Sequence, residues 1–160
     1  MLSEELLAWV GREQTYVAPE PIGRAAIRYF ARAVGDDNPI YVDADAAVDA
    51  GYRDVVAPPT LVCESVQYMD GGRDDEGYAG HTWPLPVPDG YRTVRGGNEY
   101  RFHRAAGPDD VLHVTWRLKD LTEKKSMIFC VSEVEYRNQA AELIATNLDT
   151  IIYVPPRTSS

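Results

Sequence analysis

The sequence lacks the features that mark membrane, secreted and nucleic-acid-binding proteins. None of its apolar runs approaches the roughly 20 residues that cross a bilayer, and the acidic stretch at residues 1–5 differs from a secretory signal. A formal net charge of −9 argues against the basic stripe that a nucleic-acid surface needs. We therefore expect a cytoplasmic protein with no membrane and no nucleic-acid partner.

Cysteine is also scarce, which limits the chain's redox and metal chemistry. Cys63 and Cys130 lie in apolar stretches and form no spaced metal motif. We expect both to be buried, reduced thiols, and we expect no bound metal. The 160 residues are 44% hydrophobic, which suits one globular domain with a core of useful size.

The first part of the chain carries helical patterns. Ser3 is placed to cap a short helix that ends near Gly11, and residues 15–17 follow as a short extended piece. In residues 24–34 the apolar positions recur every three or four residues, which predicts a helix with one apolar face.

Two further helices are predicted on either side of residue 55. Asp43 is placed to cap a short alanine-rich helix that stops at Gly51. A proline pair ending at Pro59 then opens a helix over residues 60–69, whose broad apolar surface is suited to burial. We expect this second helix to be the core helix.

A long loop is predicted at residues 70–90, because the stretch contains a glycine pair, an acidic pair and several prolines. Loops of this length in a compact domain are commonly functional or mobile. His81 and Trp83 lie in it and could cover a substrate opening. A disordered crossover explains the same composition.

From residue 93 onward the pattern changes to a period of two, with many β-branched and aromatic residues. The breaks between the runs are short enough for antiparallel connections. Helices followed by such strands predict an α+β fold with the strands in a meander. The four predicted strands include residues 99–104, 111–118, 127–136 and 143–154.

A ten-residue turn at residues 34–43 combines a helix stop with a polar cluster. Pro39 fixes its own φ and disfavours helical backbone at the residue before it. Rigid turns often present polar side chains to a cleft, so Asp36, Asn38 and Tyr41 are candidate ligand contacts. An ordinary turn, in which Asp and Asn bond their own backbone, explains the same residues.

This turn resembles the signature of the MaoC-like (R)-specific enoyl-thioester hydratases and dehydratases. In that family, a Gly-Asp-x-Asn-Pro-Ile-His run supplies a catalytic aspartate and histidine. Asp36 keeps the aspartate, whereas Tyr41 stands at the histidine position. Two stretches are most similar to the FAS1-like dehydratase domains of the same superfamily, namely residues 96–104 with 107–110, and residues 120–124 with 136–139.

The resemblance implies a hot-dog fold, in which a curved antiparallel sheet wraps around one central helix. This domain would span residues 14–154, with an N-terminal helix at residues 1–13 and a tail at residues 155–160. It also implies a pairing with another hot-dog chain, as a homodimer or a heterodimer. The implied ligand is an acyl thioester of coenzyme A or acyl carrier protein, and no cofactor is implied.

The resemblance also locates departures from the family's chemistry. The family's carbonyl donor is a backbone N–H at a glycine that opens the central helix, and Pro59 stands there without an N–H. Thr60 could take over this contact. Tyrosine is a poor base at neutral pH, so Tyr41 is a vestigial or modified catalytic residue. We place Asn38, Pro59, Thr60, His81 and Trp83 in the substrate-binding region.

Three functions remain open from the sequence. The first is a degenerate hydratase or dehydratase protomer that shapes an acyl tunnel while a partner chain supplies the catalytic Asp and His. The second is a self-sufficient homodimeric enzyme that uses Asp36 with Tyr41 or a loop histidine. The third is a non-catalytic module that binds acyl thioesters. His103 could replace the missing histidine, or it could be a hydrogen-bonded structural residue of a strand.

Overall fold

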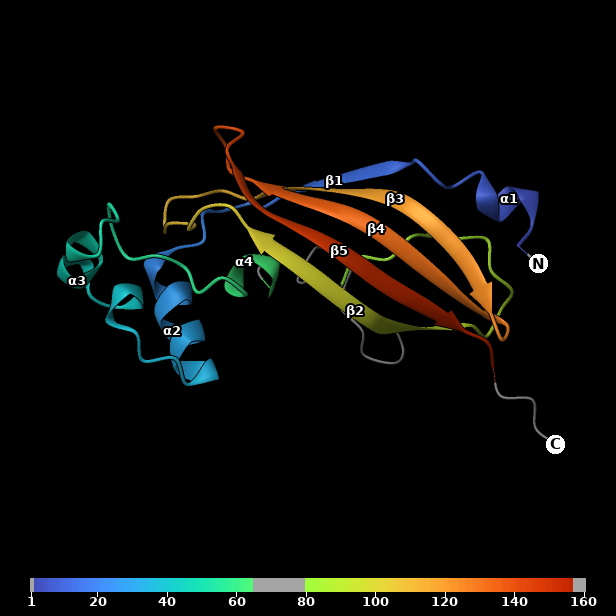
Figure 1. The fold of residues 1–160 in the computed structure, drawn as a ribbon, viewed down its shortest axis with the longest axis horizontal. Coiled ribbons are helices and arrows are strands. Elements are labelled where there is room, and N and C mark those ends of the chain that lie inside the picture. The colour runs from blue at the N-terminus through green and yellow to red at the C-terminus, as the bar shows by residue number, and fades with distance from the viewer. Residues whose placement is uncertain (1, 65–79, 157–160) are drawn as a thin grey trace.

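A computed structural model describes residues 2–64 and 80–156 of the chain. They form one curved sheet with short helices at its ends and against one face (Figure 1). The helical elements are α1 (Glu4–Leu7), α2 (Arg24–Val34), the 3-10 helix η1 (Pro39–Tyr41), α3 (Ala44–Asp49) and α4 (Leu61–Glu64). The strands are β1 (Glu13–Val17), β2 (Arg92–Phe102), β3 (His113–Lys124), β4 (Met127–Arg137) and β5 (Leu143–Val154).

The strands are antiparallel and lie in the order β1-β3-β4-β5-β2. The predicted meander is correct for β3, β4 and β5, but it is wrong for β2, which pairs with β5 at the edge opposite β1. The edge of β3 that a meander would give to β2 is occupied by β1, which pairs with it from Glu13 to Val17. Residues 103–112 therefore lead from the edge strand β2 past β5 and β4 to β3, and do not form a hairpin.

The helices lie near the two ends of the sheet and beside β2 (Figure 1). α2 and α3 lie beyond one end of the sheet, whereas α1 lies near the other. α4 is next to β2, and its Val62 and Cys63 are buried. The described part of the predicted core helix therefore lies against the sheet, and its remainder, residues 65–69, falls outside the described residues.

The local signals for α2 and α3 are confirmed in detail. α2 covers residues Arg24–Val34, and Gly35 ends it in the left-handed region with φ 72°, a conformation that suits glycine. Asp43 caps α3 through its carboxylate, which accepts from the amides of Asp45 and Ala46. Ser3 caps α1, but that helix is only four residues long and shorter than we predicted.

The core lies on the concave face of the sheet. Residues in β3 and β4 alternate between buried and less buried positions, as strands with one face against a core do. Cys63 and Cys130 are buried and are not joined in a disulfide, as we predicted for both thiols. Residues 80–91 carry no helix or strand, which confirms the described part of the predicted loop.

Candidate functional site

The turn between α2 and α3 is held by its own polar side chains. The Asp36 carboxylate accepts a hydrogen bond from the Asn38 amide at 3.2 Å. The Asn38 side chain in turn accepts from the amide of Ile40 at 3.3 Å, which starts η1. Both side chains are exposed. The local chemistry of an ordinary turn is therefore present at these two positions.

Tyr41 differs from its neighbours in the turn because it is buried, with 8% of its surface exposed. Its hydroxyl donates a hydrogen bond to Asp36. Burial raises the pKa of the Tyr41 phenol, and the negative charge and hydrogen bond of Asp36 raise it further. The phenol is therefore neutral at pH 7, where it can donate a hydrogen bond but cannot serve as a general base.

A cavity of about 290 Å³ adjoins Tyr41, and we call it the Tyr41 cavity. It lies between η1, the segment that leads into α4, and the residues that follow β2. Most of the lining is apolar or aromatic, which suits a hydrocarbon group. The lining residues are Ile40, Tyr41, Tyr52, Val56, Ala57, Pro59, Val62, Phe102, His103, Arg104, Ala105 and Ala106.

The start of α4 forms one wall of the Tyr41 cavity. Pro59 lines it and offers no N–H to a carbonyl group. The Ala57 amide is already used, because it donates to the Ala106 carbonyl at 2.8 Å. Thr60 is exposed and does not line the cavity.

His103 contributes an imidazole to the Tyr41 cavity. It is exposed, and its Nε2 lies 3.3 Å from the Thr146 hydroxyl. Its amide donates to the Ile144 carbonyl, so the residue is fixed beside β5. The structure therefore brings His103 to the same cavity as Tyr41, whereas Asp36 is not among the residues that line it.

His81 and Trp83 lie elsewhere, in the core beneath the sheet. The His81 ring stacks on Trp116 with a centroid separation of 4.3 Å, and burial lowers its pKa to about 4. The Trp83 indole donates to the Ser132 hydroxyl at 2.9 Å. Neither residue lines the Tyr41 cavity, and their assignment to substrate binding stays a prediction. His81 borders a second, smaller cavity.

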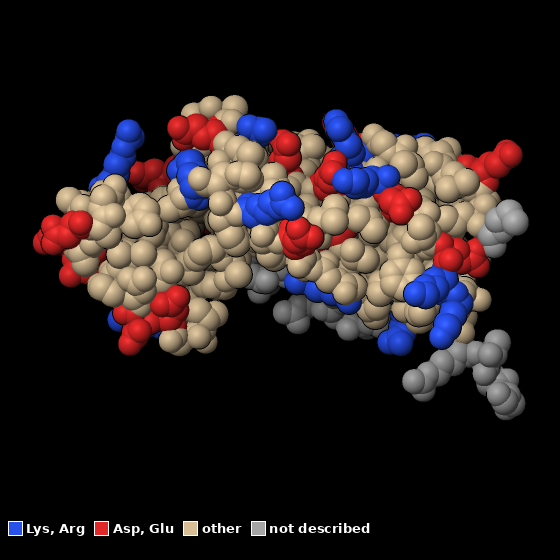
Figure 2. All heavy atoms as spheres, in the orientation of Figure 1, with Lys and Arg blue, Asp and Glu red and all other residues tan. Residues whose placement is uncertain are grey.

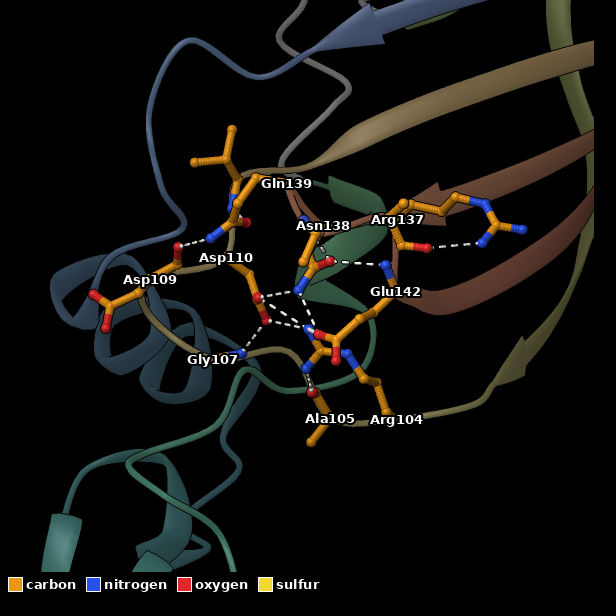
Figure 3. A network of polar contacts seen from close by, with 12 residues as sticks. Arg104, Ala105, Gly107, Asp109, Asp110, Arg137, Asn138, Gln139 and Glu142 are labelled. Atoms are coloured by element: carbon orange, nitrogen blue, oxygen red, sulfur yellow. Dashed lines mark hydrogen bonds and ion pairs between the residues drawn. The ribbon is translucent and has the colours of Figure 1, made fainter.

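A polar network fixes another wall of the Tyr41 cavity (Figure 3). The Asp110 carboxylate accepts from Arg104 at 2.9 and 3.1 Å, from the Gly107 amide at 2.8 Å and from Asn138 at 3.0 Å. Asn138 also donates to Glu142 at 2.8 Å. We call Arg104, Asp110, Asn138 and Glu142 the closed network.

The closed network connects the crossover after β2 to the turn between β4 and β5. Burial alone would raise the pKa of Asp110, but hydrogen bonds from Asn138, Gly107 and Arg104 and the positive charge of Arg104 outweigh it and lower the pKa. The network fixes the segment that ends in Ala106, and Ala106 in turn holds Ala57 at the entry to α4.

The surface gives no sign of a nucleic-acid site on the face that Figure 2 shows, because acidic and basic side chains are interspersed there. Within residues 2–64 and 80–156, no three His, Cys, Asp or Glu side chains group as they would around a metal ion. In the same ranges, no helix is long and apolar enough to span a membrane.

Comparison with known families identifies the group to which the chain belongs. Residues 8–147 match the family described as FAS1-like, dehydratase domain region. The chain belongs to this family. A UPF0336 protein of Parafrankia sp. (strain EAN1pec) is 31% identical over 152 residues, which cover 93% of this chain and 96% of that protein.

Two solved complexes share the fold of this FAS1-like dehydratase chain. A chain of the ChsH1-ChsH2 complex from Mycobacterium tuberculosis has 25% identity and a TM-score of 0.71. The match covers 91% of this chain and 90% of that chain. A chain of the C-terminally truncated HadBC (3R-hydroxyacyl-ACP dehydratase) complex from that organism has 26% identity and a TM-score of 0.67. The match covers 88% of this chain and 96% of that chain. They confirm a MaoC-like, hydratase-type hot-dog protein.

The sequence pattern did not reveal several residues that build the Tyr41 cavity. Tyr52 and Phe102 line its wall, and Arg104 belongs to the closed network behind it. One signal was present, because Phe102 is a large apolar residue between polar neighbours at the end of a strand pattern. The pairing that brings β2 beside η1 and α4 could not be read from local pattern.

Proposed function

We propose that this chain is one subunit of an acyl-thioester hydratase or 3-hydroxyacyl dehydratase. In this role it lines the acyl-binding space, and a partner hot-dog chain supplies the catalytic aspartate and histidine. The observation that carries the proposal is the phenol of Tyr41 at the histidine position, kept neutral by burial and by Asp36. Support also comes from the two solved relatives, both of which are described as complexes.

The chemistry of thioester hydration explains why the Tyr41 phenol is decisive. The reaction needs a base for water, a proton donor for the α-carbon and a hydrogen-bond donor for the thioester carbonyl. A neutral phenol with a raised pKa cannot take a proton from water at pH 7. Pro59 withholds the N–H of the third function. The chain alone therefore lacks the groups for fast turnover.

The contribution of this chain to the complex is a shaped, mainly apolar wall. Ile40, Val56 and Phe102 face the Tyr41 cavity and exclude water from an acyl group. Asp36 and Asn38 hold the turn that positions Tyr41. The thioester is carried by coenzyme A or acyl carrier protein, and the addition or loss of water requires no cofactor.

Coexpression tests this division of labour. The chain is purified alone and together with the hot-dog chain encoded by the adjacent reading frame. The native mass and the hydration of a crotonyl-type thioester are then measured. We expect the single chain to be inactive and a mixed complex to be active. Fast turnover by the single chain would overturn the proposal.

A second candidate, a self-sufficient homodimer, is favoured by one observation. His103 and Tyr41 border the same cavity, so an imidazole and a phenol face one bound ligand. If this candidate is correct, the single chain hydrates the thioester, and His103→Ala abolishes that activity. His113→Ala, a change in β3 away from the cavity, is the matched control and should have no such effect.

Restoring the family's histidine separates the two missing functions. Tyr41→His returns an imidazole to the turn, but Pro59 still lacks the N–H that would stabilise an enolate-like oxygen. Loss of one such donor typically costs about 10²–10³ in rate. We therefore expect the purified variant to stay slow in a steady-state hydration assay. Robust turnover from this single change would contradict the role given to Pro59.

A further inference from the structure

A second cavity, distinct from the Tyr41 cavity, lies on the concave face of the sheet. Its volume is about 40 Å³, which is room for water or for a hydroxyl-bearing carbon. We call it the polar cavity, because hydrogen-bonding side chains from three strands line it. The inner face of such a sheet usually carries apolar side chains. These side chains are Asn98, Tyr100, Tyr136, Asn147 and Asp149.

The register of the sheet places these polar side chains together. Asn98 pairs with Asp149 and Tyr100 pairs with Asn147 across β2 and β5. Residues two apart on a strand share a face, so these four side chains form one compact group. Of these four side chains Asn98 is exposed and Tyr100 and Asp149 are partly buried, whereas Asn147 is buried. A buried polar group costs free energy unless it finds hydrogen-bond partners, so Asn147 is the one that calls for an explanation.

Asn147 is the member of this group whose hydrogen bonds are incomplete. Only 5% of its surface is exposed. Its side-chain nitrogen donates to Asn98 at 2.7 Å, and its amide is also hydrogen bonded to Tyr136. Its Oδ1 atom is buried and has no partner among the described residues. Because Asn98 and Tyr136 both line the polar cavity, this free acceptor lies at a site where a ligand can donate to it.

The charge of the polar cavity favours an uncharged ligand. Burial raises the pKa of Asp149 to about 6, although the Arg95 charge and the Thr150 amide lower it, so this carboxylate is mainly ionised at pH 7. Its negative charge is balanced by the positive charge of Arg95, which also lines the cavity. His81, Tyr100 and Tyr136 are neutral at pH 7, because burial lowers the pKa of the imidazole and raises the pKa of both phenols. A hydroxyl group matches this lining, because it can donate to one neighbour and accept from another.

The two cavities follow one another along β2. Tyr100 lines the polar cavity, Phe102 lines the Tyr41 cavity, and the two rings stack with a centroid separation of 5.9 Å. Val62 and Cys63 of α4 border one cavity each. The four-residue step from Asn98 to Phe102 corresponds to about 13 Å along a strand. The two cavities are therefore neighbours along β2, at a spacing that a medium-length acyl chain can span.

We propose that the polar cavity binds a hydroxyl group on the acyl chain, remote from the thioester, of a substrate whose thioester lies at the Tyr41 cavity. This inference rests on the proposed function. The hydroxyl donates to Asn147 Oδ1, which then has its full set of hydrogen bonds. The preferred substrate class is consequently a hydroxylated acyl thioester and not a plain hydrocarbon one.

Paired ligands test this preference by calorimetry. A medium-chain acyl-coenzyme A with a terminal hydroxyl is compared with the unsubstituted thioester of equal length, using the protein in the oligomeric state in which it purifies. We expect the hydroxylated ligand to bind about tenfold more tightly, as one satisfied buried acceptor implies. Equal affinities would overturn this inference and leave the proposed function standing. Failure of both ligands to bind would overturn both.

Asn147→Leu removes the acceptor and should abolish the hydroxyl preference. Asn138→Leu is the matched control, because Asn138 is equally buried at 5% exposure but has its partners in the closed network. It should leave the ratio of the two affinities unchanged. A preference that survives Asn147→Leu would overturn the inference.

A hydroxyl moved along the acyl chain gives a measurement that needs no variant. In the unmodified protein the preference should peak at one position and vanish when the hydroxyl lies near the thioester. A preference independent of position would overturn the inference even if Asn147→Leu fails to fold.

Discussion

The closed network and the polar cavity are two polar clusters that each contain one buried asparagine, and these two asparagines differ in their hydrogen bonds. Asn138 donates to Asp110 and Glu142, and its carbonyl oxygen accepts from the amides of Ala140 and Glu142. Asn147 is buried to the same extent, but its Oδ1 atom finds no partner in the described part of the chain. Within residues 2–64 and 80–156, the closed network has an unpaired buried atom of its own, the Arg104 Nε, but this is a donor on a residue that is already bonded to Asp110 through its other nitrogens. The unpaired atom at the polar cavity is an acceptor, which is suited to a ligand that donates a hydrogen bond.

The buried aspartates of the two clusters differ in the same way. Asp110 faces the guanidinium of Arg104 and its pKa is lowered, so its carboxylate is stabilised by the fold. Asp149 is poorly solvated and its pKa is raised to about 6, although Arg95 partly offsets the effect of burial. The ionised form of an aspartate is therefore favoured by the fold in one cluster and disfavoured in the other.

The largest expected effect is the loss of the closed network in Asp110→Ala. The change leaves Arg104, Asn138 and the Gly107 amide without their shared acceptor. We expect the free energy of unfolding to fall by about 3 kcal/mol, as is typical when one partner of a buried charged pair is removed. Urea unfolding of the variant and the unmodified protein at pH 7 measures this fall in the free energy of unfolding.

Asp109→Ala is the neighbouring control for Asp110→Ala. The Asp109 side chain is exposed, and the hydrogen bond at this residue uses its backbone carbonyl. Its replacement should change the free energy of unfolding by less than about 0.5 kcal/mol. Similar losses in the two variants would remove the distinction that we draw for the closed network.

A smaller, pH-dependent effect is expected for Asp149→Asn. Since the pKa of Asp149 is raised in the folded state, its protonated form stabilises the fold at low pH, and that stability is lost as the pH rises from about 4 through about 6. The variant removes the ionised form, so it should be more stable than the unmodified protein at pH 7, by on the order of 2 kcal/mol.

Urea unfolding of both proteins between about pH 4 and pH 7 measures this effect. The comparison uses the difference between the two proteins, because His81 beside the same cavity has a lowered pKa and destabilises the fold as the pH falls. Tyr100, Tyr136, Cys63 and Arg95, which also face the cavity, are present in both proteins. A difference that stays constant with pH would contradict the assignment to Asp149.

The smallest expected effect concerns the bulge that shapes the polar cavity. The register of β2 against β5 shifts between Arg95 and Gly97, and both Arg95 and Asn98 line the cavity. In a regular strand, residues three apart would face opposite sides. A Cβ at Gly96 would lie 2.8 Å from the Thr150 methyl and 3.0 Å from its carbonyl oxygen.

Gly96→Ala should therefore lower the free energy of unfolding by about 1–2 kcal/mol. Gly97→Ala is the matched control, since a Cβ at that position meets nothing within 4 Å. Thermal or urea unfolding measures both changes. If Gly96→Ala proves as stable as Gly97→Ala, the close packing of this bulge is not needed to form the cavity wall.

Local signals in the sequence predicted the elements better than their pairing. The glycine and aspartate that bound α2 and α3 act through their own neighbours, so Gly35 and Asp43 were identifiable from pattern. β2 pairs with β5 because β1 already occupies the free edge of β3. Which of two strands takes an edge is decided by long-range contacts, so no local sequence pattern predicts it.

The candidate site was predictable only in part for a related reason. Tyr41 and Pro59 were identified through resemblance, and both line the same cavity. His103 and Tyr41 meet there because the crossover after β2 lies against the segment that leads into α4, where Ala106 accepts from the Ala57 amide. Asn147 was not singled out because its role follows from strand register and from counting hydrogen bonds, neither of which the sequence displays.

The strand order has a consequence for how the protein is synthesised. Thr15 of β1 pairs with Thr115 of β3, a separation of 100 residues, and their hydroxyls are hydrogen bonded. β2 likewise waits for β5, the last strand to leave the ribosome. Neither edge strand has its neighbour during much of translation, so the nascent chain exposes unpaired β-strands until β3 and β5 have been made.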